Sequence, residues 1–380
     1  RSLSLVNFIA SFGAWFSTVA IYTMVVEFGS SEFAIAIVTA MHFIPAILIA
    51  PFSGSLIDRL KIKPLMVTLL FIELSMTACF LLIETASDLW LLLIFIFIRM
   101  SAASMFFSSE MSLLAKIATG KDLQTANEIQ SIIWSFTYAV GMAVSGFIVN
   151  LYGVKAAILI DVAIFVLAFF VFLNIKINIE YKKVEEKILE LMIDGLRYIK
   201  NNKIILHLIF LHASVGLTSY DALITILAKN EYKELIAVPL AIGLSNAVRA
   251  VALMIGPLFL NKIIKKDNLQ YLLVFQGITI IIWAFAQSNF YLSLGALFFV
   301  GFSTAFLWSY TYALLQNHCD KKYIGRVISY NDMFFMLANV LTTLFIGTMA
   351  HITTTSIITI CLGVAFLLYA YYYTKIYSKI

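Results

Sequence analysis

The stretch Gly54-Ser-Leu-Ile-Asp-Arg-Leu-Lys-Ile-Lys-Pro64 is a short, basic segment between two long apolar runs. Glycine at position 54 lets two helices approach closely at a membrane edge, because it has no side chain. Asp58, Arg59 and Lys63 supply the charges for a hydrogen-bonded ion network. The alternative is a loop whose positive charge only marks the cytoplasmic side. Either way, we expect a cytoplasmic loop between two membrane helices.

The composition fits a membrane protein and excludes a soluble one. The chain has 380 residues, of which 62% are hydrophobic and 12% charged, and its mean hydropathy is +0.96. Soluble domains carry about 25% charged residues, so this chain has too little polar surface to cover itself in water. The net charge of +5 reflects topology, and we expect no nucleic-acid partner. We also expect no enzyme activity, because there is no room for a soluble catalytic domain.

Cofactor and metal motifs are missing from the sequence. There is no G-x-x-x-x-G-K phosphate loop, so ATP-driven pumping is not expected. Cys79, Cys319 and Cys361 are far apart and form no C-x-x-C pair. His318, Cys319 and Asp320 are consecutive, which is a poor arrangement for one metal ion. We therefore expect no metal and no cofactor, and no cleaved signal peptide before the first apolar run.

Apolar runs long enough to cross about 30 Å of hydrocarbon as helices follow one another along the chain. We predict twelve spans, near residues 3–27, 34–57, 65–84, 89–116, 124–150, 154–175, 203–228, 236–260, 269–287, 290–316, 326–350 and 353–376. Nearly all Lys and Arg residues fall on one side of these spans; only Lys155, Lys229 and Lys233 fall on the other. Basic loops stay in the cytoplasm, so both termini are predicted to be cytoplasmic, in an inner or cytoplasmic membrane.

One long polar connection divides the spans into six and six. We predict an N-terminal bundle at 1–175, a cytoplasmic linker at 176–202 and a C-terminal bundle at 203–380. Apolar residues of the linker recur at helical spacing, which predicts an amphipathic helix on the inner membrane surface. The two halves also echo each other: Thr125-Ala-Asn-Glu at the inner end of span five corresponds to Ser329-Tyr-Asn-Asp in span eleven.

The opening stretch resembles a known family motif. Gly54, Leu56, Asp58, Arg59 and Lys63 occupy the fixed positions of G-x-L-x-D-R-x-G-R-K, with Lys61 and Ile62 as departures. This pattern resembles the loop between helices 2 and 3 of the major facilitator superfamily of secondary transporters. The resemblance implies an all-α membrane protein with twelve transmembrane helices in two pseudo-symmetric six-helix bundles, working by alternating access as a monomer. It also implies a cytoplasmic gate at Gly54, Asp58, Arg59 and Lys63, which we expect Glu110 to join.

Further segments resemble the macrolide-exporter branch of that superfamily. They are Arg99-Met-Ser-Ala-Ala-Ser in span four, Gly141-Met-Ala-Val-Ser-Gly in span five, Asp194-Gly-Leu-Arg-Tyr-Ile-Lys in the linker and Gln316 to Val327 before span eleven. Met142 and Ser145 depart from the span-five signature. The branch implies proton-coupled export of small amphiphilic compounds across the bilayer, driven by the proton gradient. Export of a siderophore or metal chelate and flipping of a lysophospholipid stay open as alternatives.

Span seven is the most informative, because its polar residues form a stripe that we expect to line a cavity. His207, Ser214, Thr218, Asp221 and Thr225 follow helical steps and are predicted to share one face. An ionisable side chain inside a span is costly and marks function by default. Asp221 and Arg249 of span eight lie at similar depths, about 10 and 16 Å below their outer helix ends, so we predict an ion pair. A pair that only holds the helices together is the alternative.

Other polar residues at membrane depth are weaker candidates. The family resemblance implies proton handling by Arg99, and His42 is a second candidate because histidine titrates near physiological pH. Arg99 and Glu110 share a face of span four about 16 Å apart, so each needs a partner elsewhere. Glu73 is expected to lie outside the central cavity, and Asp161 to have a structural role.

The predicted cargo wall rests on composition alone. Trp15 and Trp134 add bulk in the first half, and aromatic surfaces suit amphiphilic ligands. The alternative is that these rings are ordinary members of membrane helices. The cargo-cavity residues that we predict are Asn7, Ser11, Thr18, Ser214, Thr218, Phe302, Ser309 and Tyr312.

Overall fold

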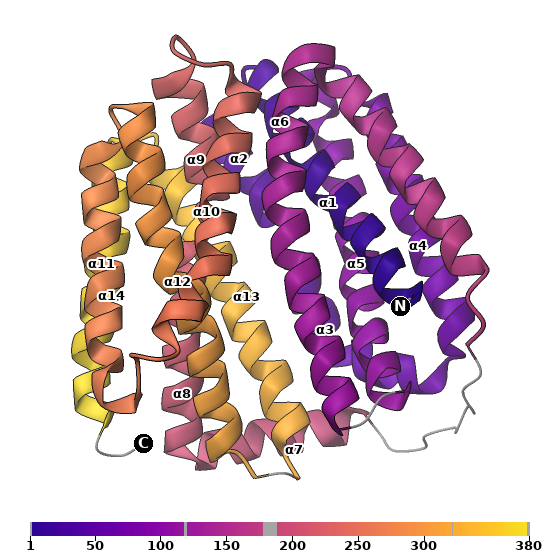
Figure 1. Ribbon diagram of the computed structural model, residues 1–380, viewed down its shortest axis with the longest axis vertical. Helices are drawn as coiled ribbons and strands as arrows, with labels where there is room; N and C mark the ends of the chain where they lie inside the picture. The colour runs from indigo at the N-terminus through magenta and orange to yellow at the C-terminus, as the bar shows by residue number, and fades with distance from the viewer. Residues whose placement is uncertain (1, 118–119, 178–187, 321, 378–380) are drawn as a thin grey trace.

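Long apolar helices account for nearly all of the computed structural model, which describes residues 2–117, 120–177, 188–320 and 322–377 (Figure 1). The α-helices of the first half and the linker are α1 (Ser2–Glu27), α2 (Glu32–Ala40), α3 (Ile44–Arg59), α4 (Ile62–Cys79), α5 (Leu89–Ile117), α6 (Gly120–Leu173) and α7 (Ile188–Asn201). Those that follow are α8 (Lys203–Ala213), α9 (Asp221–Leu227), α10 (Val238–Leu260), α11 (Leu269–Ala286), α12 (Phe290–His318), α13 (Ile324–Met349) and α14 (Thr355–Ile376).

By length and composition, 11 helices among the described residues are able to cross a membrane. One of them, Ile129–Leu173, has 45 residues, which is far more than the roughly 20 that one crossing needs. It is interrupted at Gly153, whose φ of 81° and ψ of 171° are not helical. Only glycine adopts such a φ without strain. The chain turns back at this point (Figure 1), so α6 provides the predicted fifth and sixth spans and the all-helical fold class is confirmed.

The second predicted span is interrupted at Met41–Phe43, between α2 and α3. Pro45 follows directly, and a proline has no N–H and clashes with the carbonyl four residues earlier. The backbone N–H of His42 donates to Thr39 O at 3.1 Å, which leaves the carbonyl of Val38 free. His42 Nδ1 donates to that carbonyl at 3.0 Å. The His42 side chain thus provides a hydrogen-bond donor for a carbonyl that the break in its own helix leaves free.

The motif at residues 54–64 is mostly helical rather than a loop. Helix α3 continues to Arg59 and α4 begins at Ile62, so only Leu60 and Lys61 connect them. Our expectation of a loop over the whole motif was therefore wrong. Two helices joined so tightly hold the motif rigidly at the end of the bundle.

The halves of the chain lie side by side, with the indigo-to-magenta helices on one side of Figure 1 and the orange-to-yellow helices on the other. Helix α7 crosses the lower end (Figure 1). It is fixed to the α12–α13 connection, because Asp194 binds Arg326 at 2.6 Å and Tyr198 stacks on Tyr323 with ring centres 4.2 Å apart. The preceding part of the predicted linker, residues 178–187, lies outside the described residues.

Glycine permits a very close contact between α10 and α12. A Cβ atom built on Gly256 would lie 1.7 Å from the carbonyl oxygen of Phe302. No side chain relaxes that clash, because the obstacle is backbone. By contrast, a Cβ built on Gly295, which lies on α12 like Phe302, would meet nothing within 4 Å.

We therefore expect Gly256→Ala to push α10 and α12 apart and to destabilise the protein by roughly 1–3 kcal/mol or more. Gly295→Ala is the matched control and should stabilise its helix by about 0.5–1 kcal/mol. Thermal unfolding of the detergent-solubilised protein measures both. An unchanged midpoint for Gly256→Ala would show that the helices are not packed this closely.

Candidate functional site: a buried ion pair at a broken helix

The predicted seventh span is not one helix but four short pieces. Helix α8 ends at Ala213, a 3₁₀ turn covers Ser214–Thr218, α9 begins at Asp221, and a π-helical turn covers Ala228–Tyr232. Ser214 and Thr218 bond the carbonyls three residues earlier, at 2.6 and 2.8 Å. Such bonds weaken and bend helices. Our prediction of one continuous polar face from His207 to Thr225 was therefore wrong.

Asp221 lies at this break and faces Arg249 of α10. The distance from Asp221 Oδ1 to Arg249 Nη1 is 3.6 Å, and the two side chains are only 17% and 10% exposed. This is the contact that the sequence predicts. At 3.6 Å the pair has no hydrogen bond, and Asp221 Oδ1 is buried without a hydrogen-bond partner in the described structure. The attraction is therefore electrostatic and incomplete.

The hydrogen bonds of Arg249 go to other groups. Its Nη2 donates to the carbonyl of Thr218 at 2.8 Å, an acceptor exposed by the helix break. Its Nη1 donates to the hydroxyl of Tyr138 at 3.4 Å, and the guanidinium lies over the ring of Tyr220, 5.3 Å from its centre. A buried arginine needs such partners, because burying an unpaired charge costs several kcal/mol.

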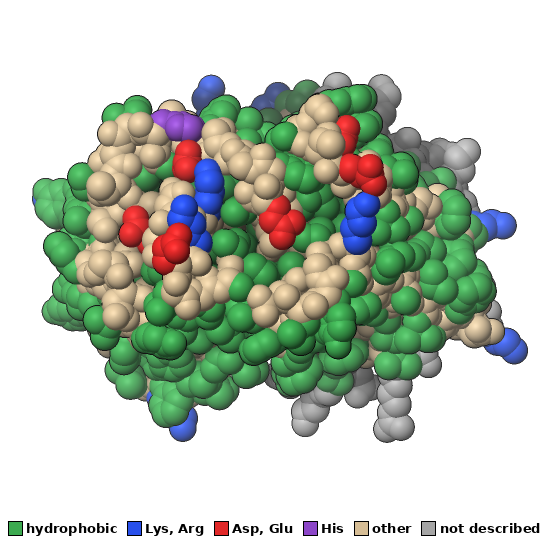
Figure 2. All heavy atoms as spheres, turned by 90° about the horizontal axis from the view of Figure 1, so that it is seen from above, with side chains coloured by type: hydrophobic (Ala, Val, Ile, Leu, Met, Phe, Trp, Pro, Cys, Tyr) green, Lys and Arg blue, Asp and Glu red, His purple; other side chains and the backbone are tan. Residues whose placement is uncertain are grey.

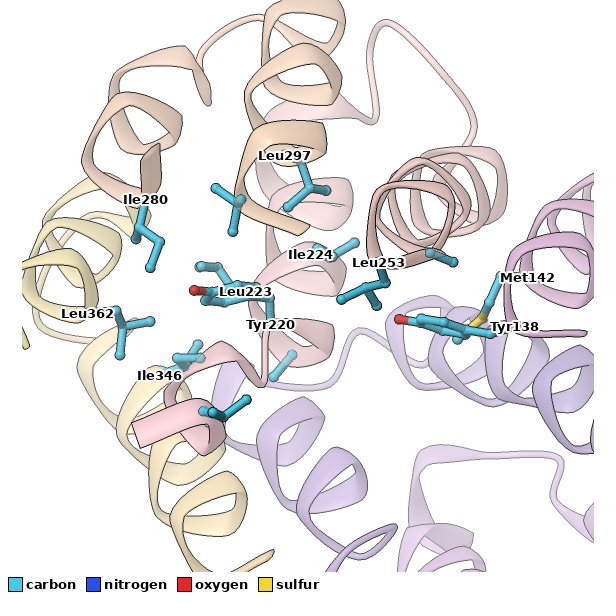
Figure 3. Close-up of a cluster of buried hydrophobic side chains, with 14 of the residues drawn as sticks. Tyr138, Met142, Tyr220, Leu223, Ile224, Leu253, Ile280, Leu297, Ile346 and Leu362 are labelled. Carbon is cyan, nitrogen blue, oxygen red and sulfur yellow. The ribbon is translucent and has the colours of Figure 1, made fainter. Parts of the chain in front are cut away.

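Tyr138 extends this network to the other half of the chain. It lies on α6 and is 4% exposed, and its hydroxyl donates to Asn246 Oδ1 of α10 at 3.1 Å. In Figure 3 the hydroxyl points from α6 toward Leu253 of α10. The sequence analysis missed both Tyr138 and Asn246. The available signal was a tyrosine four residues after Trp134 in an apolar span, which is also typical of ordinary packing.

His207 does not join this network. It lies on α8 and its Nδ1 is 2.5 Å from the hydroxyl of Tyr372 on α14. The helix break rotates Asp221 away from the line of residues that starts at His207. We expect His207→Gln to lower the stability of the protein by only about 1 kcal/mol, because it loses one hydrogen bond. The thermal unfolding midpoint in detergent measures this, and a fall as large as that expected for a broken buried ion pair would contradict it.

The sequence analysis also missed His212, the histidine that is fully buried. Its Nδ1 is 2.8 Å from Thr311 Oγ1 of α12. The Thr311 hydroxyl donates its one hydrogen to Leu307 O at 2.6 Å, so Nδ1 carries the proton and donates. Nε2 is then an acceptor without a partner in the described structure. The signal was the same as for His42, a histidine inside an apolar span.

Arg99 finds a partner that the sequence analysis did not assign to it. Its Nη2 lies 3.2 Å from Asp161 Oδ2, with side-chain exposures of 5% and 0%, and its Nη1 donates to Ser17 at 2.7 Å. Gly13 makes room, since a Cβ there would lie 2.4 Å from Asp161 Oδ1. The pair lies wholly within the first half of the chain, and with Ser17 it joins α5 and the second pass of α6 to α1.

Glu110 and two predicted cargo residues form a separate cluster. Asn7 Nδ2 donates to Glu110 Oε2 at 3.0 Å and also contacts Gln130. Ser11 donates to Asn7 at 2.6 Å. Glu110 is 1% exposed, and its Oε1 has no partner among the described residues. The structure thus brings Asn7, Ser11 and Glu110 together between α1, α5 and α6.

Two of the predicted gate residues have described side chains, Lys63 at the end of α6 and Glu110 in the cluster with Asn7. Lys63 donates to the carbonyl of Leu173, the last residue of α6, at 3.1 Å. The C-terminal end of a helix carries partial negative charge and therefore attracts a cation. The contact lies within the first half rather than between the halves. The side chains of Asp58 and Arg59 and the surroundings of Gly54 are outside the described part of the chain, so the gate role of these residues stays a prediction.

The remaining predicted cargo residues do not come together. Thr18 is 5% exposed and donates to Ala14 O at 2.9 Å. Phe302 packs between α10 and α12, where its ring lies 6.3 Å from that of Phe259. Ser309 is exposed, and Tyr312 stacks with Trp308 at 5.1 Å. Ser214 and Thr218 are buried and bond their own helix.

Charged contacts join the halves at the upper end of Figure 1. Lys229 binds Glu32 of α2 at 3.0 Å and the carbonyl of Ser30 at 2.8 Å, and His351 Nδ1 lies 3.6 Å from Glu32. Figure 2 views this end and shows Lys and Arg side chains beside Asp and Glu. Near the start of α10, a Cβ on Gly146 of α6 would lie 2.7 Å from Pro239 O. The halves are therefore packed tightly at this end.

These features define a class of protein: a multi-pass helical membrane protein with a buried ion pair where its two halves meet. The sequence pattern of the Major Facilitator Superfamily matches residues 3–343. The chain belongs to this superfamily, and it is a secondary transporter rather than an enzyme. No curated protein matches the sequence.

Solved structures show the same fold over the whole chain at low identity. The nucleoside transporter NupG matches with a TM-score of 0.77 and 13% identity, covering 99% of this chain and 98% of that one. A POT family transporter in complex with 5-aminolevulinic acid matches with a TM-score of 0.76 and 10% identity, covering 99% and 96%. A D-xylose-proton symporter matches with a TM-score of 0.75 and 14% identity, covering 97% and 96%.

Proposed function

We propose that the protein is a proton-coupled exporter of small amphiphilic compounds that works by alternating access. The observation that carries this proposal is the buried Asp221–Arg249 pair, which lies at a helix break and contacts Tyr138 of the other half. A titratable pair at that junction is placed to link protonation to the relative position of the halves.

A carboxylate beside an arginine suits coupling for a physical reason. Burial favours the neutral carboxyl, whereas the nearby guanidinium favours the charged carboxylate. A group balanced between these states releases a proton when an arriving cargo shifts the balance, and it takes a proton up when the cargo leaves. Cargo and proton then compete, which is antiport. One of the similar structures is named as a D-xylose-proton symporter, so proton coupling is compatible with this fold.

The proposal of an amphiphilic cargo rests on aromatic residues. Trp134 is 45% exposed and Trp308 is 41% exposed. Each ring packs against a buried residue with a polar group: Trp134 against Tyr138 and Trp308 against His212. Aromatic surfaces with a few polar groups bind amphiphiles. The similar structures are named for nucleosides, 5-aminolevulinic acid and D-xylose, so the fold alone does not select a cargo.

For the topology we propose two bundles, residues 1–175 and 203–380, with residues 176–202 and both termini on the cytoplasmic side of an inner or cytoplasmic membrane. The support is the basic bias of the lower end, where Lys61, Lys63, Arg197, Lys200 and Arg326 lie. The upper end, closed by Lys229 and Glu32, is then extracytoplasmic. In this proposal the protein transports its cargo as a monomer.

The test is a proteoliposome assay under an imposed pH gradient, with internal pH recorded. Erythromycin and rhodamine 6G represent amphiphilic drugs, apo-enterobactin represents siderophores, and lysophosphatidylethanolamine represents lysolipids. Proton movement triggered by a drug supports the proposal. Proton silence with both drugs, together with siderophore flux or lysolipid scrambling, overturns it in favour of that cargo.

A further inference from the structure

We infer that Tyr138 is the positioning residue that couples an aromatic cluster of the first half to the Asp221–Arg249 pair, by competing with Asp221 for one nitrogen of Arg249. The cluster consists of Trp15, Trp134 and Tyr138. This inference deepens the proposed function, because it names both the ring-bearing class of cargo that the cluster takes and the route by which that cargo displaces a proton.

The competition follows from the hydrogen-bond geometry. Arg249 Nη1 is 3.4 Å from the Tyr138 hydroxyl and 3.6 Å from Asp221 Oδ1, so this nitrogen lies between two oxygens and is close to neither. A good charge-assisted hydrogen bond is about 2.7–2.9 Å long, and neither contact reaches it. Nη2 is already held by Thr218 O at 2.8 Å. A small shift of Nη1 away from Tyr138 therefore completes the bond to Asp221.

Tyr138 is able to act as the competing acceptor. A phenol has one hydrogen to donate, and Tyr138 donates it to Asn246 Oδ1 at 3.1 Å. Toward Arg249 the hydroxyl oxygen thus accepts. Asn246 in turn donates to Ile242 O of its own helix at 3.2 Å, which fixes the amide. Movement of the Tyr138 ring breaks its bonds to both α10 residues together.

The ring of Tyr138 belongs to a cluster that reaches the surface. Its centre lies 4.5 Å from that of Trp15 and 5.4 Å from that of Trp134, and the two indoles are 5.7 Å apart. Tyr138 is buried, whereas Trp134 is 45% exposed. Trp134 is thus the accessible end of the cluster, and a planar or apolar ring stacked on it presses on Tyr138.

The groups facing Asp221 determine the sign of the effect. They are Arg249 of α10, Tyr22 of α1 and Tyr138 of α6, together with the adjacent Tyr220. Arg249 is the cation among these groups. When Nη1 leaves Tyr138 and bonds Asp221, the carboxylate is stabilised and its proton leaves to water. Binding a ring to the cluster therefore releases a proton, and by reciprocity protonation of Asp221 weakens ring binding.

The first experiment needs no cargo. Tryptophan fluorescence of the purified full-length protein in detergent is recorded from pH 4 to 9. We expect a titration step in the wild type, and its loss in Asp221→Asn, in Trp134→Phe and in Tyr138→Phe. Tyr138→Phe keeps the ring and removes only the hydroxyl. Tyr232→Phe, a buried tyrosine packed on Phe290, is the matched control and should keep the step.

Persistence of the step in Tyr138→Phe overturns the inference, as does a folded wild type without any step. A separate binding assay with rhodamine 6G tests the class of cargo. We expect wild-type affinity to be about 10-fold higher at pH 8 than at pH 5.5, and affinity of Tyr138→Phe to be independent of pH. A wild type that does not bind rhodamine 6G overturns the ring-stacking part. The proposed export is read separately, as proton flux in liposomes.

Discussion

Asp221→Asn is expected to reduce pH-gradient-driven transport by about 10-fold or more while leaving cargo exchange without a gradient largely intact. Asparagine matches aspartate in shape but exchanges no proton. It therefore keeps the space beside Arg249, 3.6 Å away, and removes the negative charge together with the titration. Initial rates with and without an imposed pH gradient, in proteoliposomes of the same protein content, separate the two effects.

The matched control for this variant is Asp332→Asn. Asp332 is also a carboxylate of the second half at membrane depth, on α13, and its described neighbours are the neutral amide of Asn331 and the hydroxyl of Tyr312. It has no arginine in the contacts that the structure describes. If Asp332→Asn abolishes driven transport and Asp221→Asn does not, the coupling site has been assigned to the wrong carboxylate.

The second large effect concerns stability rather than transport. Arg99→Met leaves Asp161 buried at 0% side-chain exposure without its cation. Removing one partner of a buried pair costs about 3–5 kcal/mol, because the remaining charge has no compensation. We expect a clear fall in the thermal unfolding midpoint in detergent and poor recovery of folded protein.

The double variant Arg99→Met/Asp161→Leu separates lost pairing from lost shape. Apolar residues of similar volume replace buried ion pairs with little or no loss of stability, so the double variant should recover most of the midpoint. Arg326→Met is the surface control: its pair with Asp194 is 26% and 40% exposed, and such pairs contribute about 0–1 kcal/mol. A double variant as unstable as Arg99→Met would show that Arg99 acts through its contacts with Phe80 and Phe165 instead.

The two buried pairs differ in a way that fits these two predictions. Arg99 and Asp161 are 3.2 Å apart, lie within one half of the chain and are supported by Ser17. Arg249 and Asp221 are 3.6 Å apart and lie at a helix break, and the arginine contacts the other half. A closed pair holds helices together, whereas a loose pair with a competing acceptor is able to change state.

The sequence by itself determined the fold class and the pairing of Asp221 with Arg249. Composition, apolar run length and the motif around Asp58 depend only on residue identity and spacing, and so does the depth of a residue along a helix. These are local quantities, and they remain readable without a structure. The same reasoning located Arg99 and Glu110 as residues in need of partners.

Only the tertiary structure decided which partners they have. Asp161 meets Arg99 and Asn7 meets Glu110 because non-adjacent helices pack side by side, and helical periodicity contains no information about a neighbouring helix. The breaks at Pro45 and after Ala213 also decided which residues share a face. An irregular stretch changes the angle at which every later side chain leaves the helix axis. For that reason the prediction of one polar stripe starting at His207 was wrong. The contact of Tyr138 with Arg249 comes from the other half of the chain, so only the three-dimensional structure shows it.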